Sequence, residues 1–199
     1  MIVVVAEKPS VGRDIARVLG CKTSGEGFLS GDGYTVTWAV GHLVTLCEPD
    51  EIDEKYKKWR MADLPMLPET LPTKVISKAK KQFTIVKKLI NAPDTERLIC
   101  ATDAGREGEL IFYYIYQQAK CKKPVDRLWI SSMTDEAIRE GFAQLKPDSE
   151  YEGLRKSAVC RSEADWLVGM NASRAFTLRY DVLLSVGRVQ TPTLAILVK

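Results

Sequence analysis

The stretch of sequence that decides the fold lies at residues 97–111 and reads RLICATDAGREGELI. Its first part, Arg97 to Ala101, is a short apolar run that predicts a buried strand. From Arg106 onward the apolar residues recur at helical spacing, which predicts a helix with one buried face. Asp103 and Glu107 lie where this strand gives way to this helix, with Glu109 close by in the sequence. Ligands of α/β sheets collect outside the carboxyl ends of strands, so this acidic corner is the first candidate site.

Grouped carboxylates are unfavourable unless something positive shares the site. The corner is therefore expected to lie where a hard cation or a phosphate binds. The start of the chain has a related pattern. Ile2 to Ala6 is a β-branched run that predicts a central strand, and Glu7 and Lys8 follow it directly. A lone Glu-Lys pair is usually a solvated ion pair, but a second acidic strand end at Asp103 makes Glu7 a candidate for the same site.

The composition restricts the function classes. The chain has 199 residues, of which 45% are hydrophobic and 28% charged, as in one globular domain plus a piece or two small domains. No apolar run is long enough to span a bilayer, so no membrane partner is expected. Five cysteines without a Cys-x-x-Cys pair indicate reduced thiols and a cytoplasmic protein. The single histidine, His42, excludes a histidine-rich metal site and is interpreted as structural.

Any nucleic-acid binding has to come from local patches, because the net charge is only +3. A lysine-rich segment at residues 74–90 predicts an amphipathic helix with Val75 and Ile76 in its apolar stripe, and its lysines are interpreted as a solvated face. Residues 49–72 are rich in proline and predict a surface excursion. Within that excursion Arg60 is a candidate phosphate contact.

Strands and helices alternate over the first three quarters of the chain. A strand is predicted at Tyr34 to Val40 and another at Val125 to Ser131. Ser10 and Thr134 are predicted N-caps of helices that follow strands. This order predicts an α/β fold with a mostly parallel sheet and helices on both faces. A Pro-Asp-Ser turn at residues 147–149 then predicts a boundary, which gives one domain at 1–150 and a mainly helical segment at 151–199.

Four motifs together resemble those of type IA DNA topoisomerases, nearest to the topoisomerase III branch. In chain order they are EKPS at 7–10, DAGREGE at 103–109, RSEADWLVG at 161–169 and SVGRVQTPTL at 185–194. The resemblance covers essentially the whole chain. It implies a Toprim, Rossmann-like domain at 1–150 and the truncated start of a helical DNA-binding domain at 151–199.

The resemblance also implies a mechanism and its residues. Enzymes of this family cut one DNA strand through a 5′-phosphotyrosine, pass a strand and reseal the cut without ATP. Carried onto this chain, Glu7 exchanges a proton with the departing 3′-oxygen, and Lys8 offsets phosphate charge. Glu7, Asp103 and Glu107 are the implied Mg²⁺ ligands.

Single-stranded DNA is the implied partner of the segment at 185–192. Gly187 lets a backbone approach, Arg188 and Gln190 reach phosphate or base, and the helix start predicted with Thr191 as N-cap favours an anion. The full set of expected DNA contacts is Arg60, Arg161, Ser185, Gly187, Arg188, Val189, Gln190, Thr191 and Pro192. An ion pair of Arg161 with Asp165 is the structural alternative for Arg161.

Two departures from the family pattern affect these expectations. Gly105 stands where the family has a second aspartate, which predicts a weakened or altered Mg²⁺ site in which Glu109 or water is a substitute ligand. None of the seven tyrosines matches the family's catalytic motif. The nucleophile is therefore expected in a later domain, and this stretch alone is expected to be inactive.

Two other classes stay open. Another Toprim enzyme, a primase or a nuclease, shares the acidic motifs but does not need the motifs at 161 and 185. A non-catalytic module that binds single-stranded DNA needs only the later motifs. A topoisomerase is expected in the cytoplasm of a bacterium, in association with the nucleoid.

Overall fold

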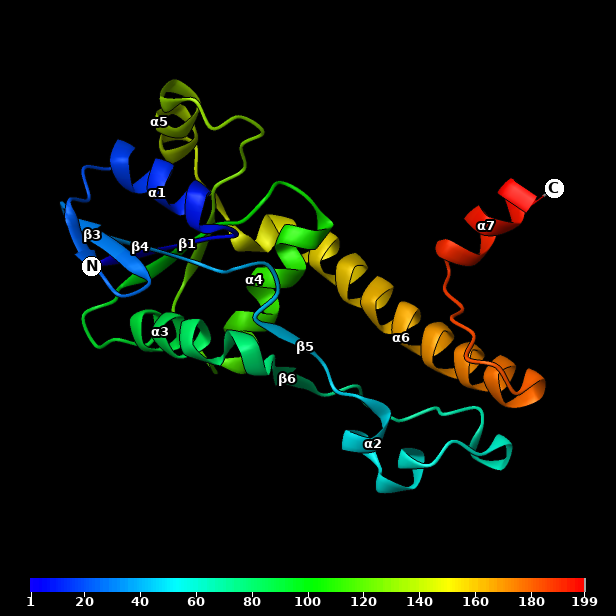
Figure 1. Ribbon diagram of the computed structural model, residues 1–199. Coiled ribbons are helices and arrows are strands. Elements are labelled where there is room, and N and C mark those ends of the chain that lie inside the picture. Colours follow the sequence, from blue (N-terminus) through cyan, green and yellow to red (C-terminus); the bar gives the residue numbers. More distant parts are fainter. Residues whose placement is uncertain (199) are drawn as a thin grey trace. The chain divides into compact units, whose positions relative to one another are not determined.

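The computed structural model describes residues 1–198, which divide into two compact units (Figure 1). The first unit comprises Met1–Thr45 and Lys74–Ala158, and the second comprises Leu46–Thr73 and the residues from Val159 on. The two-domain division at residue 150 stays a prediction. Residues 46–73, which that division assigns to the first domain, are grouped here with the later residues.

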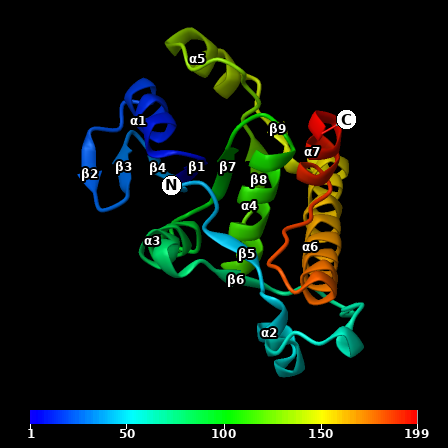
Figure 2. The ribbon, with the colours of Figure 1, turned by 45° about the vertical axis from the view of Figure 1, so that its right-hand side comes forward.

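A seven-stranded sheet forms the centre of the first unit, in the order β2-β3-β4-β1-β7-β8-β9 (Figure 2). The four strands β4, β1, β7 and β8 are parallel, and β2, β3 and β9 join the two edges antiparallel. A mostly parallel α/β sheet is thereby confirmed. The bounds of the strands are β1 Ile2–Ala6, β2 Thr23–Gly25, β3 Phe28–Gly31, β4 Tyr34–Trp38, β7 Arg97–Ala101, β8 Val125–Arg127 and β9 Lys146–Pro147.

The register of β1 and β7 positions the site. These two strands occupy the centre of the sheet, and their apolar side chains are almost completely buried. Ile2 lies opposite Arg97 and Ala6 lies opposite Ala101, so the two parallel strands end together. Glu7 and Asp103 consequently leave the sheet at the same edge.

Helices cover both faces of this sheet, as predicted. Helices α1 (Pro9–Val18) and α5 (Asp135–Ala143) lie on one face, and α3 (Lys80–Ile90) and α4 (Arg106–Gln118) lie on the other (Figure 1). On the first face, Ile15 of α1 and Ile138 of α5 belong to one buried cluster with Val4 of β1. On α4, the predicted inward residues are all buried: Leu110, Ile111, Tyr114 and Ile115.

The second unit is mainly helical. It contains α2 (Pro49–Ile52), two short 3₁₀ turns at Glu54–Lys57 and Met61–Asp63, most of α6 (Glu152–Tyr180), and α7 (Gln190–Val198). The residues predicted as a surface excursion are held to α6 by side chains of that helix. Arg174 Nη1 donates to the Tyr56 carbonyl at 2.7 Å, and Asn171 Oδ1 accepts from the Met66 N–H at 2.6 Å. Just before the excursion, Trp166 Nε1 donates to the Cys47 carbonyl at 2.9 Å.

A small two-stranded sheet, β5 (Val44–Leu46) with β6 (Thr73–Val75), marks the points where the chain leaves the first unit and returns. The prediction of a helix through Val75 and Ile76 is therefore wrong: α3 begins only at Lys80, after a 3₁₀ turn at Ser77–Ala79. The β-branched Thr73 and Val75 favour the strand that forms there.

Some predicted element ends are wrong as well. Helix α1 begins at Pro9 with Lys8, not Ser10, as its N-cap, because proline suits the first helical position and has no N–H left to satisfy. The strand predicted to reach Ser131 stops at Arg127. Helix α7 begins at Gln190, so Thr191 is not its N-cap. Thr134 does cap α5, since its hydroxyl accepts from the Ala137 N–H at 3.3 Å.

Among residues 1–198, no helix combines the length and the apolar character needed to cross a membrane.

Candidate active site

Glu7 and Asp103 meet at the carboxyl edge of the sheet. Glu7 is only 7% exposed, and its Oε2 accepts a hydrogen bond from the Asp103 N–H at 3.1 Å. This bond fixes one oxygen of the Glu7 carboxylate and ties the end of β1 to the end of β7. The Asp103 side chain, in contrast, is half exposed. The pair thus combines a positioned, nearly buried carboxylate with one that faces solvent.

Lys8 supplies the positive charge at this corner. Its Nζ lies 3.2 Å from Asp103 Oδ2 and 3.6 Å from Glu7 Oε1. The hydrogen bond to Asp103, and then the negative charges of Asp103 and Glu7, raise the pKa of the Lys8 ammonium above its ordinary value. Lys8 is therefore a cation at any physiological pH. Its side chain is half exposed, which leaves it accessible to a phosphate from solvent.

A close approach of backbone to backbone shapes the acidic loop. A Cβ at Gly108, in the first turns of α4, would lie 2.1 Å from the Asp103 carbonyl oxygen. The Thr102 hydroxyl donates to the Gly108 carbonyl at 2.8 Å and holds this approach. Gly105 differs, because a Cβ there meets nothing within 4 Å and its φ of 172° is extended backbone. The aspartate that the family has at this position would therefore fit, and glycine is not required by the fold.

The residue that supports the corner from inside is Arg127, which the sequence analysis did not single out. Its Nε donates to Glu109 Oε1 at 2.6 Å, and both side chains are at most 1% exposed. Its Nη2 donates to the Asp103 carbonyl at 2.8 Å, and its Nη1 donates to three further carbonyls, those of Cys100, Thr102 and Leu128. The signal in the sequence was an arginine directly before the apolar residues Leu128, Trp129 and Ile130 of a predicted strand.

The role expected for Glu109 as a substitute metal ligand is therefore wrong. Its carboxylate lies in the core and is occupied by Arg127. The interpretation of His42 as structural stays untested; its Nε2 contacts Glu107 Oε1 at 2.5 Å. The only histidine of the chain thus sits against one of the expected metal ligands.

The fit of Mg²⁺ can be judged from these contacts. Glu7 and Asp103 share the Lys8 ammonium, Glu107 contacts His42, and Glu109 faces the core. Over the part of the chain that the structure describes, no three Asp, Glu, His or Cys side chains lie close enough together to hold a metal ion. Asp103 and Glu107 are therefore the carboxylates that remain open to Mg²⁺ from solvent, and in this arrangement the cation between Glu7 and Asp103 is Lys8.

Two of the expected DNA contacts in the second unit, Arg161 and Arg188, pair with the same carboxylate. Arg188 Nη1 lies 2.9 Å from Asp165 Oδ1, and Arg161 Nε lies 3.7 Å from Asp165 Oδ2. Two cations thus share one anion, and each arginine is close to half exposed. Arg60 forms a local ion pair with Asp63 at 2.7 Å.

Hydrogen bonds within the segment 185–192 hold its backbone in a loop. Gln190 Nε2 donates to Ser185 Oγ at 2.8 Å, and the Gly187 N–H donates to Thr191 Oγ1 at 3.0 Å. Val189 is 64% exposed and Pro192 is exposed as well. The loop consequently presents polar atoms and Arg188 on an open surface.

A mostly parallel sheet with a glutamate after its first strand and an acidic loop after the neighbouring strand defines the Toprim class. The chain belongs to the Toprim family, because the model of the Toprim domain matches residues 2–133. Residues 149–199 match a second family model, described as DNA topoisomerase.

Similar proteins agree with these matches. DNA topoisomerase 3 of Bacillus cereus is 57% identical over 195 residues, and that of Bacillus subtilis is 55% identical over 197 residues. These alignments cover 98% and 99% of this chain but 27% of each relative, so the chain spans about a quarter of their length. The resemblance to the topoisomerase III branch is thereby confirmed.

A solved structure shares the fold. Full-length topoisomerase I from Thermotoga maritima superimposes with a TM-score of 0.64 at 22% identity. The alignment covers 98% of this chain and 29% of that one.

Proposed function

We propose that this chain forms part of the strand-cleavage site of a type IA DNA topoisomerase of the topoisomerase III kind. Such an enzyme breaks one strand through a 5′-phosphotyrosine and rejoins it without ATP. The observation that carries the proposal is the nearly buried Glu7 carboxylate, held by the Asp103 N–H beside the Lys8 ammonium. The relatives named DNA topoisomerase 3 support it over the whole chain.

The chemistry assigned to Glu7 is proton transfer. When a tyrosine phenolate attacks the phosphorus, the bond from phosphorus to the 3′-oxygen breaks, and the protonated Glu7 carboxyl gives its proton to that oxygen. In the reverse step the carboxylate takes the proton back and the 3′-oxygen displaces tyrosine. Lys8 acts beside it as a fixed positive charge for the phosphate, a role that costs little reorganisation because its ammonium is already in place.

We propose that Asp103 and Glu107 bind Mg²⁺ only weakly. Asp103 and Glu107 are 50% and 67% exposed, and each contacts a single partner side chain, Lys8 or His42. Exposed ion pairs of this kind contribute little to stability, so both carboxylates can turn toward a cation from solvent. When bound, Mg²⁺ would supply further charge neutralisation for a phosphate.

For the second unit we propose binding of single-stranded DNA by the segment 185–192 together with Arg161. Asp165 neutralises only one of the two arginines, which leaves a net positive charge beside an exposed loop. A phosphate can replace Asp165 as the partner of Arg188 at small cost, because the pair is solvent-exposed. Ser185, Gly187, Gln190 and Thr191 then line the strand. Action on chromosomal DNA would place the protein in the cytoplasm, at the nucleoid.

Relaxation of negatively supercoiled DNA tests the proposal, combined with trapping of a covalent adduct by denaturant. The complete protein should relax the DNA and remain attached to a 5′ end after denaturation. The 199-residue chain alone should do neither, since its tyrosines do not match the family's catalytic motif. A complete protein that binds single strands but never forms an adduct would instead be a binding module. Lasting cuts or synthesised primers would indicate a nuclease or a primase.

A further inference from the structure

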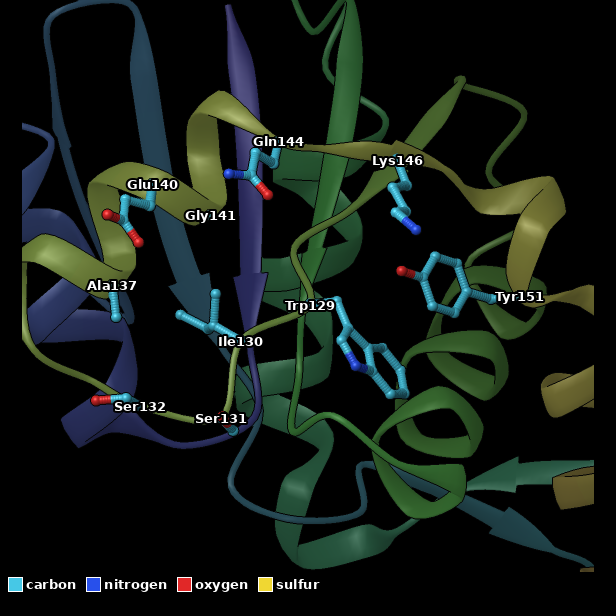
Figure 3. A pocket seen from close by; sticks show the side chains of 10 residues that line it. All are labelled: Trp129, Ile130, Ser131, Ser132, Ala137, Glu140, Gly141, Gln144, Lys146 and Tyr151. Carbon is cyan, nitrogen blue, oxygen red and sulfur yellow. The ribbon is translucent and has the colours of Figure 1, made fainter.

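A pocket of about 340 Å³ lies in the first unit between the segment after β8 and helix α5 (Figure 3). None of the residues proposed for cleavage lines it. Its wall combines two aromatic rings, two hydroxyls, an amide and an ammonium, contributed by Trp129, Tyr151, Ser131, Ser132, Gln144 and Lys146. A volume near the lower end of the range for ligand pockets suits an occupant about as large as one nucleotide.

The aromatic part of this wall is a pair of stacked rings. Trp129 stacks on Tyr151 with ring centroids 5.0 Å apart and an angle of 25° between the planes. The buried Arg127 guanidinium lies 5.0 Å from the Trp129 ring centroid and 5.9 Å from that of Tyr151, which fixes the pair against the core. Trp129 is nevertheless 42% exposed. An ordered, exposed indole is a stacking surface that accepts any nucleobase.

The polar part of the wall supplies complementary groups. In Figure 3 the Lys146 side chain extends toward the Trp129–Tyr151 pair, while Glu140 lies at the other end of the pocket. Lys146 contacts Glu150 at 3.4 Å, with both side chains more than half exposed, so this ion pair is easily exchanged for a phosphate. The hydroxyls of Ser131 and Ser132 and the amide of Gln144 offer donors and acceptors to the edge of a base.

We propose that this pocket binds one unpaired base of a DNA strand, stacked on Trp129, with the adjacent phosphate at Lys146. The inference rests on the proposed action on DNA and adds a second holding point for a single strand, in the first unit. A proline-rich peptide would also use an aromatic wall, but it would gain nothing from the ammonium beside it. The favoured occupant is therefore a nucleotide.

Photo-crosslinking tests the site without changing the protein. An oligonucleotide of about eight thymidines with one base replaced by 5-iodouracil should crosslink to Trp129 or Tyr151, as identified by mass spectrometry of the peptides. An excess of unlabelled oligothymidylate should suppress the crosslink. Crosslinks that map only to other segments, or suppression by a proline-rich peptide and not by DNA, would overturn the proposal.

Binding measurements on variants give the second arm. Trp129→Ala should weaken binding of oligothymidylate about 5- to 100-fold, Trp129→Phe should weaken it much less, and binding of an abasic oligonucleotide should not change. Lys146→Ala should reduce the slope of log affinity against log salt by about one, because one phosphate contact is lost. Lys88→Ala, on the exposed face of α3, should leave this slope unchanged. If the Trp129→Ala variant binds oligothymidylate as tightly as the unaltered protein and its thermal unfolding curve is unchanged, the pocket proposal is contradicted but the proposed function is not. If the unaltered protein forms neither a covalent adduct nor any crosslink with DNA, the proposed function is contradicted as well.

Discussion

At the scale of single residues, Arg127 connects the core of the first unit to the acidic corner. It pairs with Glu109 inside the protein and donates to the Asp103 carbonyl from the same guanidinium. Buried ion pairs contribute little net stability, yet removal of one partner leaves an uncompensated charge. Arg127 is therefore expected to matter for stability and for the position of Asp103 together.

Glu109→Leu should reduce the free energy of unfolding by about 3–5 kcal/mol, because Arg127 keeps its charge without an acidic partner. The double variant Arg127→Met with Glu109→Leu should recover part of that loss. Urea denaturation followed by circular dichroism measures both. A loss below about 1 kcal/mol for the single variant would mean that the buried pair is not formed.

Lys8 competes with metal ions for the same carboxylates. Lys8→Met removes the ammonium that contacts Glu7 and Asp103, so Mg²⁺ binding should become about two- to fivefold tighter. Isothermal titration with MgCl₂ checks this directly. The matched control is Lys55→Met, which removes an ammonium from a similarly exposed carboxylate, Asp53, outside the site. Weaker Mg²⁺ binding by the Lys8 variant would show that Lys8 and the metal do not compete.

At the scale of elements, the residue spacing along α4 explains why Glu109 is not a metal ligand and why the buried face of this helix was predicted correctly. Residues two apart on a helix point in nearly opposite directions, at about 100° per residue. Glu107 and Glu109 therefore cannot serve one site, and Glu109 faces the core while Glu107 is exposed. The helical period of the apolar residues gave the buried face of α4 correctly for the same reason. The partner of Glu109 was not predictable from the pattern of α4, because Arg127 belongs to another element, the strand β8.

The approach of α4 to the end of β7 gives an element-scale test. Gly108→Ala should destabilise the protein by about 1–3 kcal/mol, because the new methyl group meets the backbone of Asp103 and has no side chain to displace. Gly153→Ala in α6 is the control, since a Cβ there meets nothing within 4 Å and alanine favours a helix by up to about 1 kcal/mol. Thermal unfolding of the two variants should give shifts of opposite sign. A tolerated alanine at 108 would contradict the close approach.

At the scale of the whole molecule, the order of four motifs along the chain was enough to predict the family. The alternation of strands and helices likewise predicted the parallel sheet, since its central strands β1 and β7 are short, almost entirely apolar runs. The association of residues 46–73 with α6 was not predictable. It depends on single side chains such as Trp166 and Arg174 that donate to backbone carbonyls, and such bonds leave no periodic pattern in a sequence.

The proposed DNA segment predicts a salt-dependent phenotype. Arg188→Ala should weaken binding of a single-stranded oligonucleotide and reduce the slope of log affinity against log salt by about one. Arg97→Ala is a matched control, because Arg97 is equally exposed, at 44%, and also pairs with an aspartate. Fluorescence anisotropy at several salt concentrations measures the slopes. If the unaltered protein and both variants give equal slopes, Arg188 does not contact DNA and serves only in its ion pair with Asp165.

The central claim is that Glu7 transfers the proton during strand cleavage, and Glu7→Gln in the complete protein tests it most directly. The substitution keeps the shape of the side chain but removes the transferable proton. Adduct formation with single-stranded DNA, timed after rapid mixing, should slow by at least about 100-fold while DNA affinity stays unchanged. Glu69→Gln, at an exposed site outside the corner, should leave the rate unaltered. Adduct formation by the Glu7→Gln variant at the normal rate would contradict the claim.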